Sequence, residues 1–149
     1  MLDLGCPALS ADPAAIRVVK DEVVAVEFAA APGLLMSAVG PNHYATGDAL
    51  ITGSTGDRWC VSRERFDAKY RPCAGTQSGR AGDYRNVPVV VYAKQIHEPF
   101  RVARAPGGDV LTGHAGDWAL EYSPGDCGLV DRARFERVYR RAEAGSPPA

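Results

Sequence analysis

The 149-residue sequence has almost no net charge and no hydrophobic run long enough to cross a membrane. A membrane-spanning helix needs ~20 consecutive apolar residues, and no stretch approaches that length. The formal net charge is −1, so we expect no general electrostatic attraction to nucleic acid or to membranes. The N-terminus has no basic segment followed by an apolar one, which predicts the absence of a signal peptide and a cytoplasmic location.

Cysteine and histidine are also scarce, and their spacing does not fit the usual metal or disulfide frameworks. The four cysteines include no Cys-x-x-Cys pair, and no two of the three histidines have metal-ligand spacing. We therefore expect reduced thiols, no metal and no cofactor. The sequence also lacks a Gly-x-Ser-x-Gly elbow, a Gly-x-x-x-x-Gly-Lys phosphate loop and a His-Glu-x-x-His motif. These absences favour a binding protein over an enzyme.

The sequence does contain an internal repeat with an offset of 69 residues. Residues 47–71 align with residues 116–140 without a gap, and 11 of the 25 aligned positions are identical. Because a repeat constrains the architecture, we interpret the chain as a small unit built twice. A half of about 60 residues would be marginally stable by itself, so the two copies are expected to pack tightly.

Each copy is predicted to contain strands, a hairpin and a short closing helix. The β-branched run Val23–Phe28 is typical of a buried strand, and the residues that follow Pro88 repeat it. Gly-Asp pairs mark the hairpin turns, because Gly tolerates unusual φ values and Asp caps its own backbone. A helix is predicted over Arg63–Tyr70 with Ser62 as its N-cap, and a matching helix is expected after Asp131.

This pattern predicts an α+β fold of two tandem homologous β-rich units that pack with pseudo-two-fold symmetry. The Gly-, Ser- and Arg-rich stretch between the copies is interpreted as a linker. The predicted division is an irregular lead-in over residues 1–17, a first repeat unit over 18–72, a linker over 73–86, a second repeat unit over 87–141 and a flexible tail over 142–149.

Candidate ligand-binding residues are sought where the copies differ, because the shared residues have structural roles. Trp59 and Trp118 do not align with each other, so the common scaffold does not require them at equivalent places. An exposed Trp beside a loop is a recognition candidate, and core packing is its alternative role. A groove at the seam between the copies is the expected site for an unidentified protein or small-molecule ligand. Its predicted lining is Trp59, Trp118, His114, His43, Tyr92 and Tyr44.

Two other functions are kept as alternatives. A small enzyme acting on a nucleotide or sugar-phosphate would use the second copy, with Asp117, His114 and Glu121 as candidate groups, although a turn role explains Asp117 equally well. Nucleic-acid binding would use arginines expected on one helix face, and a solvated surface is the competing interpretation. These arginines are Arg134, Arg137 and Arg141.

The second copy contains the strings VPVVVYAKQIHEPFRV, GHAGDWALE and PGDCGLVDRARFERVY, which span most of residues 87–141. With these strings it resembles a small phage-associated domain family of the PGDYG type. The first copy matches more weakly over residues 18–72. The resemblance implies two divergent copies of a compact β-rich domain of bacterial or phage origin, and it assigns no activity or catalytic residue. The sequence therefore predicts an uncharacterised binding or adaptor module.

Overall fold

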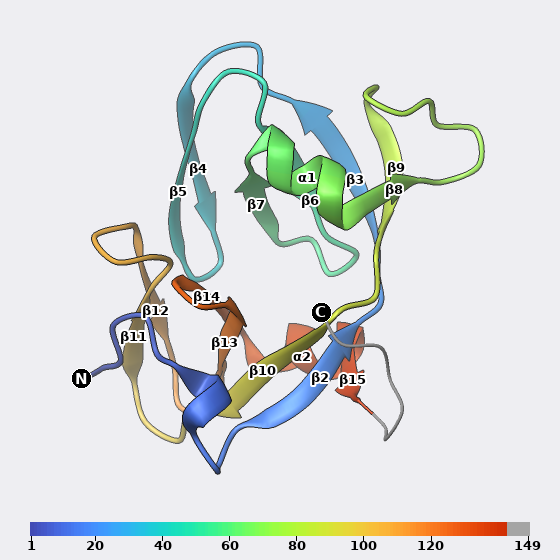
Figure 1. The fold of residues 1–149 in the computed structure, drawn as a ribbon. Helices are drawn as coiled ribbons and strands as arrows, with labels where there is room; N and C mark the ends of the chain where they lie inside the picture. Colours follow the sequence, from blue (N-terminus) through green and yellow to red (C-terminus); the bar gives the residue numbers. More distant parts are fainter. Residues whose placement is uncertain (143–149) are drawn as a thin grey trace. The chain divides into compact units, whose positions relative to one another are not determined.

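The computed structural model describes residues 1–142, which form two compact units (Figure 1). The central unit is Asp21–Pro88, and the terminal unit combines Met1–Lys20 with the chain from Val89 onward. The flexible tail predicted over 142–149 falls outside the described residues from residue 143 onward.

The central unit is built on a five-stranded sheet with the strand order β7-β6-β3-β9-β8. A helix, α1 (Arg63–Lys69), covers one face of this sheet, and its Phe66 belongs to the same buried cluster as Val24 and Ile51. The strands are β3 (Val23–Phe28), β6 (Ala49–Thr52), β7 (Arg58–Val61), β8 (Tyr70–Pro72), β9 (Gly82–Asn86) and a separate hairpin of β4 (Gly33–Ser37) and β5 (Gly40–Tyr44).

The terminal unit contains a sheet of the corresponding order, β14-β13-β10-β2-β15, and a second sheet of order β1-β11-β12. The helix α2 (Arg132–Val138) supplies Phe135 to a buried cluster with Val91 and Leu120. The other elements are β1 (Leu2–Asp3), the 3₁₀ turn η1 (Leu9–Ala11), β2 (Ile16–Lys20), β10 (Val90–Gln95), β11 (Phe100–Ala103), β12 (Val110–Gly113), β13 (Trp118–Ser123), β14 (Asp126–Val130) and β15 (Tyr139–Arg141).

Both helices begin where the sequence predicts. The Ser62 side chain accepts a hydrogen bond from the main-chain N–H of Arg65, and Asp131 accepts one from Arg134. Each cap satisfies a backbone donor that has no partner inside the first helical turn. The helix starts predicted at Ser62 and Asp131 are therefore confirmed.

Two strands pair in a different sheet from the strand that follows them in the chain. β2 is followed by β3 after only two residues, yet it pairs with β10 and β15. β9 precedes β10 in the chain, yet it pairs with β3 and β8. Each of the two larger sheets therefore contains one inner strand that directly precedes, along the chain, a strand of the other sheet.

Glu22 fixes the point at which the chain passes from the terminal unit to the central unit. It is 4% exposed, and its carboxylate accepts hydrogen bonds from both the main-chain N–H and the hydroxyl of Ser54. Its own N–H donates to Asn86 Oδ1 at 2.8 Å. A buried carboxylate with these partners is costly to displace, so these contacts hold the start of β3 within the central unit.

The expected α+β class with pseudo-two-fold packing is contradicted. Strands account for 47% of the described residues and helices for only 12%, so the fold is mainly β. Each α-helix is seven residues long and closes one sheet rather than forming a helical layer. Within residues 1–142, no helix is long and apolar enough to span a membrane.

Candidate functional site

One face of the central sheet is covered by α1, and the other is covered only beside β7, where the β4–β5 hairpin buries Cys60. Side chains alternate along a strand, so neighbouring residues of β3 point to opposite faces. Val24 and Val26 are buried on the side of α1, whereas Ala25 and Glu27 between and beyond them are exposed. We call the second side, which carries Ala25 and Glu27, the outer face.

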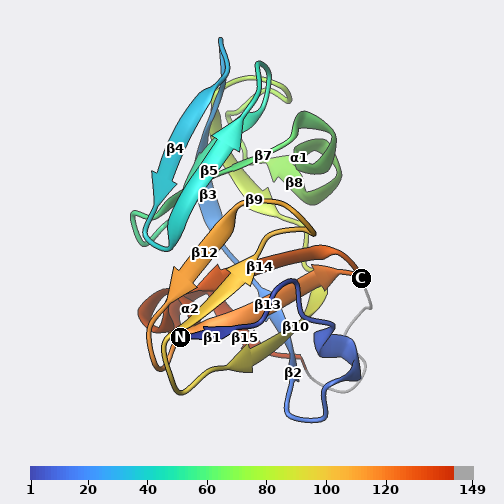
Figure 2. The same cartoon turned by 90° about the vertical axis from the view of Figure 1, so that its left-hand side faces the viewer.

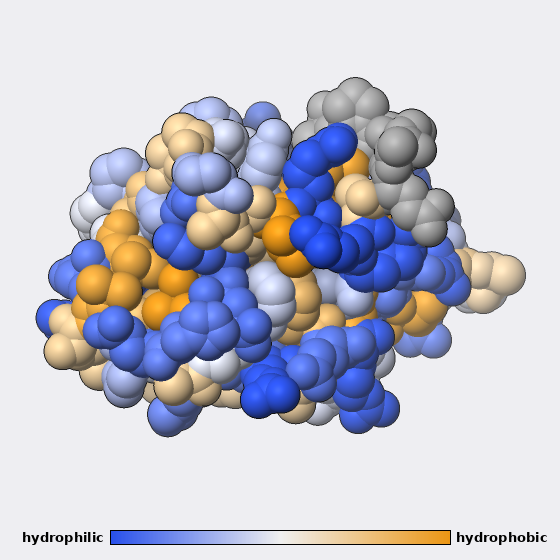
Figure 3. All heavy atoms as spheres, turned by 90° about the horizontal axis from the view of Figure 1, so that it is seen from below, coloured by the Kyte–Doolittle hydropathy of each residue, from blue (hydrophilic) through white to orange (hydrophobic). Residues whose placement is uncertain are grey.

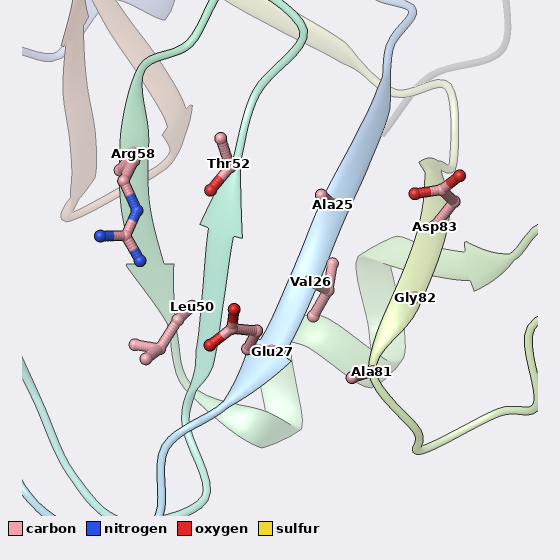
Figure 4. A pocket seen from close by; sticks show the side chains of 9 residues that line it. All are labelled: Ala25, Val26, Glu27, Leu50, Thr52, Arg58, Ala81, Gly82 and Asp83. Atoms are coloured by element: carbon pink, nitrogen blue, oxygen red, sulfur yellow. The ribbon is translucent and has the colours of Figure 1, made fainter.

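The outer face of the central sheet carries a hollow with a volume of about 390 Å³ (Figure 4). Leu50 and Ala25 supply apolar surface. Arg58 on β7 and Asp83 on β9 lie at opposite ends of the hollow, on the same face of the sheet (Figure 4). Glu27 on β3 lies between these two charged residues. The complete lining is Ala25, Val26, Glu27, Leu50, Thr52, Arg58, Ala81, Gly82 and Asp83.

The charges at this hollow are available to a ligand. Glu27 and Arg58 are exposed, and neither side chain forms an ion pair with any residue in the described range 1–142. An exposed apolar surface with charged side chains beside it can hold a short polar segment or a small molecule. The face in Figure 3 shows hydrophobic groups with hydrophilic residues between them.

The terminal sheet has a matching outer face, and its positions correspond to those of the central sheet. Leu50 and Ala119 are equivalent in the 69-residue repeat. Leu50 pairs with Glu27 across β6 and β3, and Ala119 pairs with Lys94 across β13 and β10. Glu27 and Lys94 are therefore counterparts with opposite charge.

In the terminal unit this face is covered by the N-terminal segment, which we define as residues 1–12 (Figure 2). η1 packs on β10 and β13, and Leu9 is only 3% exposed. Glu121 beneath it is 5% exposed, whereas its repeat equivalent Thr52 remains partly exposed in the central unit. The part of this face that η1 covers in the terminal unit is thus left exposed in the central unit, at Ala25 and Glu27.

Polar contacts hold the N-terminal segment on the terminal sheet. The main-chain N–H of Ser10 donates to Glu121 Oε1 at 2.9 Å, and Lys94 Nζ lies 2.8 Å from Asp12 Oδ2. The hydrogen bond from Lys94 lowers the pKa of Asp12, and the N–H of Ala14 contributes in the same direction. The terminal sheet therefore holds the N-terminal segment with a hydrogen bond to the main chain and an ion pair between side chains.

The N-terminal segment also shields a cysteine. Cys127 Sγ donates to the Pro7 carbonyl at 3.6 Å, and burial raises the pKa of the Cys127 thiol. The thiol therefore stays protonated and unreactive. Arg58 occupies the equivalent position in the central sheet, where it is exposed.

Residues 40–140 match the model of the family described as PGDYG protein. The chain belongs to this family. Residues 124–128 read Pro-Gly-Asp-Cys-Gly, which agrees with the letters of the family name except at Cys127. No curated protein and no solved structure matches the chain.

In the central unit of this PGDYG protein, the predicted site residues lie around β5 and β7. Trp59 is partly buried and packs against the cluster beneath α1. His43 is exposed, and its carbonyl accepts a hydrogen bond from Cys60 Sγ at 3.5 Å. Tyr44, also on β5, is partly buried and lies against Gly33. None of these three side chains lines the hollow.

In the terminal unit, the predicted residues Trp118 and Tyr92 lie on opposite faces of the sheet. Trp118 stacks on Phe135 with ring centroids 3.9 Å apart, and its buried Nε1 has no hydrogen-bond partner among residues 1–142. Tyr92 pairs with Glu121 on the outer face. The His114 side chain is 91% exposed. The structure therefore does not gather these three side chains into one cavity.

The candidate catalytic carboxylates both bind the backbone. Asp117 is 7% exposed and accepts hydrogen bonds from the main-chain N–H groups of His114 and Arg132, each at 2.9 Å. Glu121 accepts from Ser10, as described above. No group of three His, Cys, Asp or Glu residues suited to a metal ion occurs in the described part of the chain.

The three arginines considered for nucleic acid do not share one exposed helix face. Arg134 is 4% exposed, whereas Arg137 and Arg141 are exposed. α2 ends at Val138, so Arg141 lies on β15 instead of the helix. Nucleic-acid binding by this set stays a prediction without a shared surface to support it.

The residues of the hollow were missed by the sequence analysis, although the sequence carries a signal for them. Glu27 is a charged residue in the otherwise apolar strand Val23–Phe28, and it shares a face with the small Ala25, which indicates a face that is not fully buried. In the alignment of the two copies, Thr52 is equivalent to Glu121, and Arg58 is equivalent to Cys127. Differences in polarity between the copies, rather than unaligned Trp residues, indicate this site.

Proposed function

We propose that this PGDYG protein is a binding or adaptor module that holds a partner on the outer face of its central sheet. The observation that carries the proposal is the contrast between the two sheets. The terminal sheet holds the N-terminal segment on this face, whereas the central sheet leaves a hollow of about 390 Å³ there. The hollow, rather than the seam between the copies, is the proposed site.

The lining of the hollow supports binding more than catalysis. It contains carboxylates, one guanidinium and one hydroxyl, but no histidine, cysteine or serine. The alternative enzyme site in the second copy relies on Asp117 and Glu121, and both carboxylates already accept backbone hydrogen bonds. Ligand binding makes use of open apolar surface and unpaired charge, which are the features present at the hollow.

We further propose that the units descend from a tandem duplication. The 69-residue offset and the equal strand orders of the two larger sheets support a common ancestor. A cytoplasmic location and an origin in a bacterial mobile element or phage rest on sequence composition and on the family resemblance. Neither is required for the binding proposal.

A blocked variant tests the proposed site. We expect Leu50→Arg to fill the hollow with a charged side chain, and Val110→Arg provides a matched control because Val110 is exposed on β12 of the terminal unit. The wild-type chain and both variants are titrated with a panel of short peptides and organic fragments while amide resonances are followed by NMR.

The proposal predicts that panel members shift the amide resonances of Ala25 and Thr52 in the wild type and in Val110→Arg. The same members leave these resonances unchanged in Leu50→Arg. The proposal is overturned if no panel member shifts them, or if the shifts persist in Leu50→Arg.

A further inference from the structure

We infer that the occupant of the central outer face is a segment of a partner protein that follows the path of the N-terminal segment and carries a basic side chain at the place of Asp12. This inference rests on the proposed function and specifies its ligand. It is read from the terminal unit, where the chain itself supplies a covering segment and shows each contact that such a segment makes.

The first part of the path is an added strand. β1 pairs in parallel with β11, through main-chain hydrogen bonds from Leu2 to Pro99 and from Leu4 to Arg101. A third bond runs from the N–H of Ala103 to the Gly5 carbonyl at 2.7 Å. The segment then crosses to the outer face, where η1 packs on β10 and β13.

The central unit repeats this edge without its added strand. β4 corresponds to β11, because each pairs with the strand that leads to the repeated block. Among the described residues, β4 pairs with β5 alone. Leu34 and Met36 on β4 are 53% and 63% exposed. A sheet edge with exposed apolar side chains is a template for an incoming strand.

Charge defines the occupant more narrowly. Lys94 holds Asp12 in the terminal unit, and its counterpart in the central unit is Glu27. A segment that follows the same path therefore needs Lys or Arg where the N-terminal segment has Asp12. For the same reason, the N-terminal segment of a second copy is disfavoured, because its Asp12 would meet the carboxylate of Glu27.

The other two contacts of the N-terminal segment have equivalents in the central unit, one hydrogen-bond acceptor and one donor. Glu121 accepts the N–H of Ser10, and Thr52 at the equivalent position offers a hydroxyl oxygen as acceptor. Cys127 donates to a backbone carbonyl, and its equivalent Arg58 is a stronger donor. The partner segment thus requires only an apolar residue at the place of Leu9 and a basic residue three positions later.

A pair of peptides that differ at one residue tests this inference. One peptide has the sequence of residues 1–12, and the other has the same sequence with Asp12→Lys. Binding of each to the full chain is measured by fluorescence anisotropy under reducing conditions. An ion pair at a partly exposed site predicts about fivefold tighter binding of the Lys peptide.

Charge reversal on the protein provides the decisive comparison. Glu27→Lys should reverse the preference, so that the Asp peptide binds about fivefold more tightly than the Lys peptide. Glu98→Lys makes the same charge change at an exposed position of the terminal unit and should leave the preference of the wild type unchanged.

Equal binding of both peptides to the wild type, or an unchanged preference in Glu27→Lys, overturns the inference. If the Lys peptide fails while members of the fragment panel still shift Ala25 and Thr52, only the identity of the occupant is rejected. If neither binds, the proposed function falls with it. Concentration-dependent dimerisation that Glu27→Lys alters would identify a second copy as the occupant and would likewise overturn the inference.

Discussion

The pair Gly33 and Tyr44 has a small residue on the first strand and an aromatic residue on the second, and the equivalent pair in the terminal unit has the reverse order. They pair across β4 and β5, and the equivalent pair across β11 and β12 is Phe100 and Gly113. A Cβ placed on Gly113 would lie 2.5 Å from the Phe100 ring, so the glycine is required by the aromatic side chain opposite. The aromatic side chain is on the second strand of the pair in the central unit and on the first strand in the terminal unit. In both units it fills the space beside the glycine opposite.

The same exchange explains why the two Trp residues do not align. Phe28 pairs with Ala49 and packs edge-on against Phe66, whereas Trp118 pairs with Gln95 and stacks on Phe135. Trp59 pairs with Ile51 in the central unit, whereas its repeat equivalent in the terminal unit is Gly128, which lies against Tyr122. A misaligned Trp can therefore reflect compensated core packing, which a single sequence cannot distinguish from ligand recognition.

The role of Asp117 can be tested by its removal. Asp117→Ala leaves the main-chain N–H groups of His114 and Arg132 without their acceptor, so we expect a loss of about 1–3 kcal/mol in the free energy of unfolding. Chemical denaturation followed by Trp fluorescence measures the change. An unchanged unfolding midpoint would contradict the structural role and would return Asp117 to consideration as a catalytic acid.

At the scale of elements, local signals predicted well those segments whose partners are near in sequence. The β-branched run Val23–Phe28 forms β3 with the predicted bounds, and the helices start at their predicted caps. β9 lies inside the segment 73–86, which was expected to be a linker. Its sequence has little β-branched character, and it becomes a strand because β3 and β8 supply partners on both sides.

The attachment of the N-terminal segment should depend on pH. The pKa of Asp12 is lowered from its ordinary value of 3.8 in the folded chain, chiefly by Lys94. A group with a lowered folded-state pKa stabilises the attached state above its ordinary pKa, and that contribution is lost as the pH falls through the lowered value.

We therefore expect η1 to loosen as the pH falls below about 4, before the sheets unfold. Heteronuclear NOE values of the Ser10 and Ala11 amides measure this change, with Ala93 in β10 as a reference. Lys94→Met should remove the ion pair with Asp12, so η1 should be looser in this variant than in the wild type at neutral pH. Heteronuclear NOE values that remain equal in both proteins at all pH values would contradict the role of this ion pair.

At the scale of the whole molecule, the sequence repeats and the folded units are not the same segments. The repeat indicates that the chain is built twice, but no local pattern shows which sheet receives β2 or β9. The choice depends on long-range pairing and on Glu22, whose burial with Ser54 and Asn86 becomes visible only in the folded chain. The covering of one outer face by residues 1–12 is equally non-local.

The strand exchange makes an unusual prediction for two core substitutions. Val18 is 1% exposed and belongs to the terminal core, although its sequence lies beside the central unit. Val18→Asp should therefore unfold the terminal unit. The free-energy cost of burying an unpaired carboxylate is comparable to the whole free energy of unfolding of a small unit. Tyr84→Asp should instead disrupt the central unit, where Tyr84 is 1% exposed.

Hydrogen exchange distinguishes the two variants. We expect Val18→Asp to remove protection from the amides of β10 and β13 while those of β3 and β6 keep theirs, and Tyr84→Asp to give the opposite pattern. Loss of protection in β3 and β6 alone on Val18→Asp would contradict the exchange of β2.

The central claim is that the outer face of the central sheet binds a segment as the terminal sheet binds residues 1–12. The most direct measurement is a set of intermolecular NOEs between the full chain and the Asp12→Lys peptide. The account predicts NOEs from the leucine methyls at position 9 of the peptide to the methyls of Ala25 and Leu50. NOEs to Val24 and Phe66 on the opposite face, or to the terminal unit alone, would contradict it.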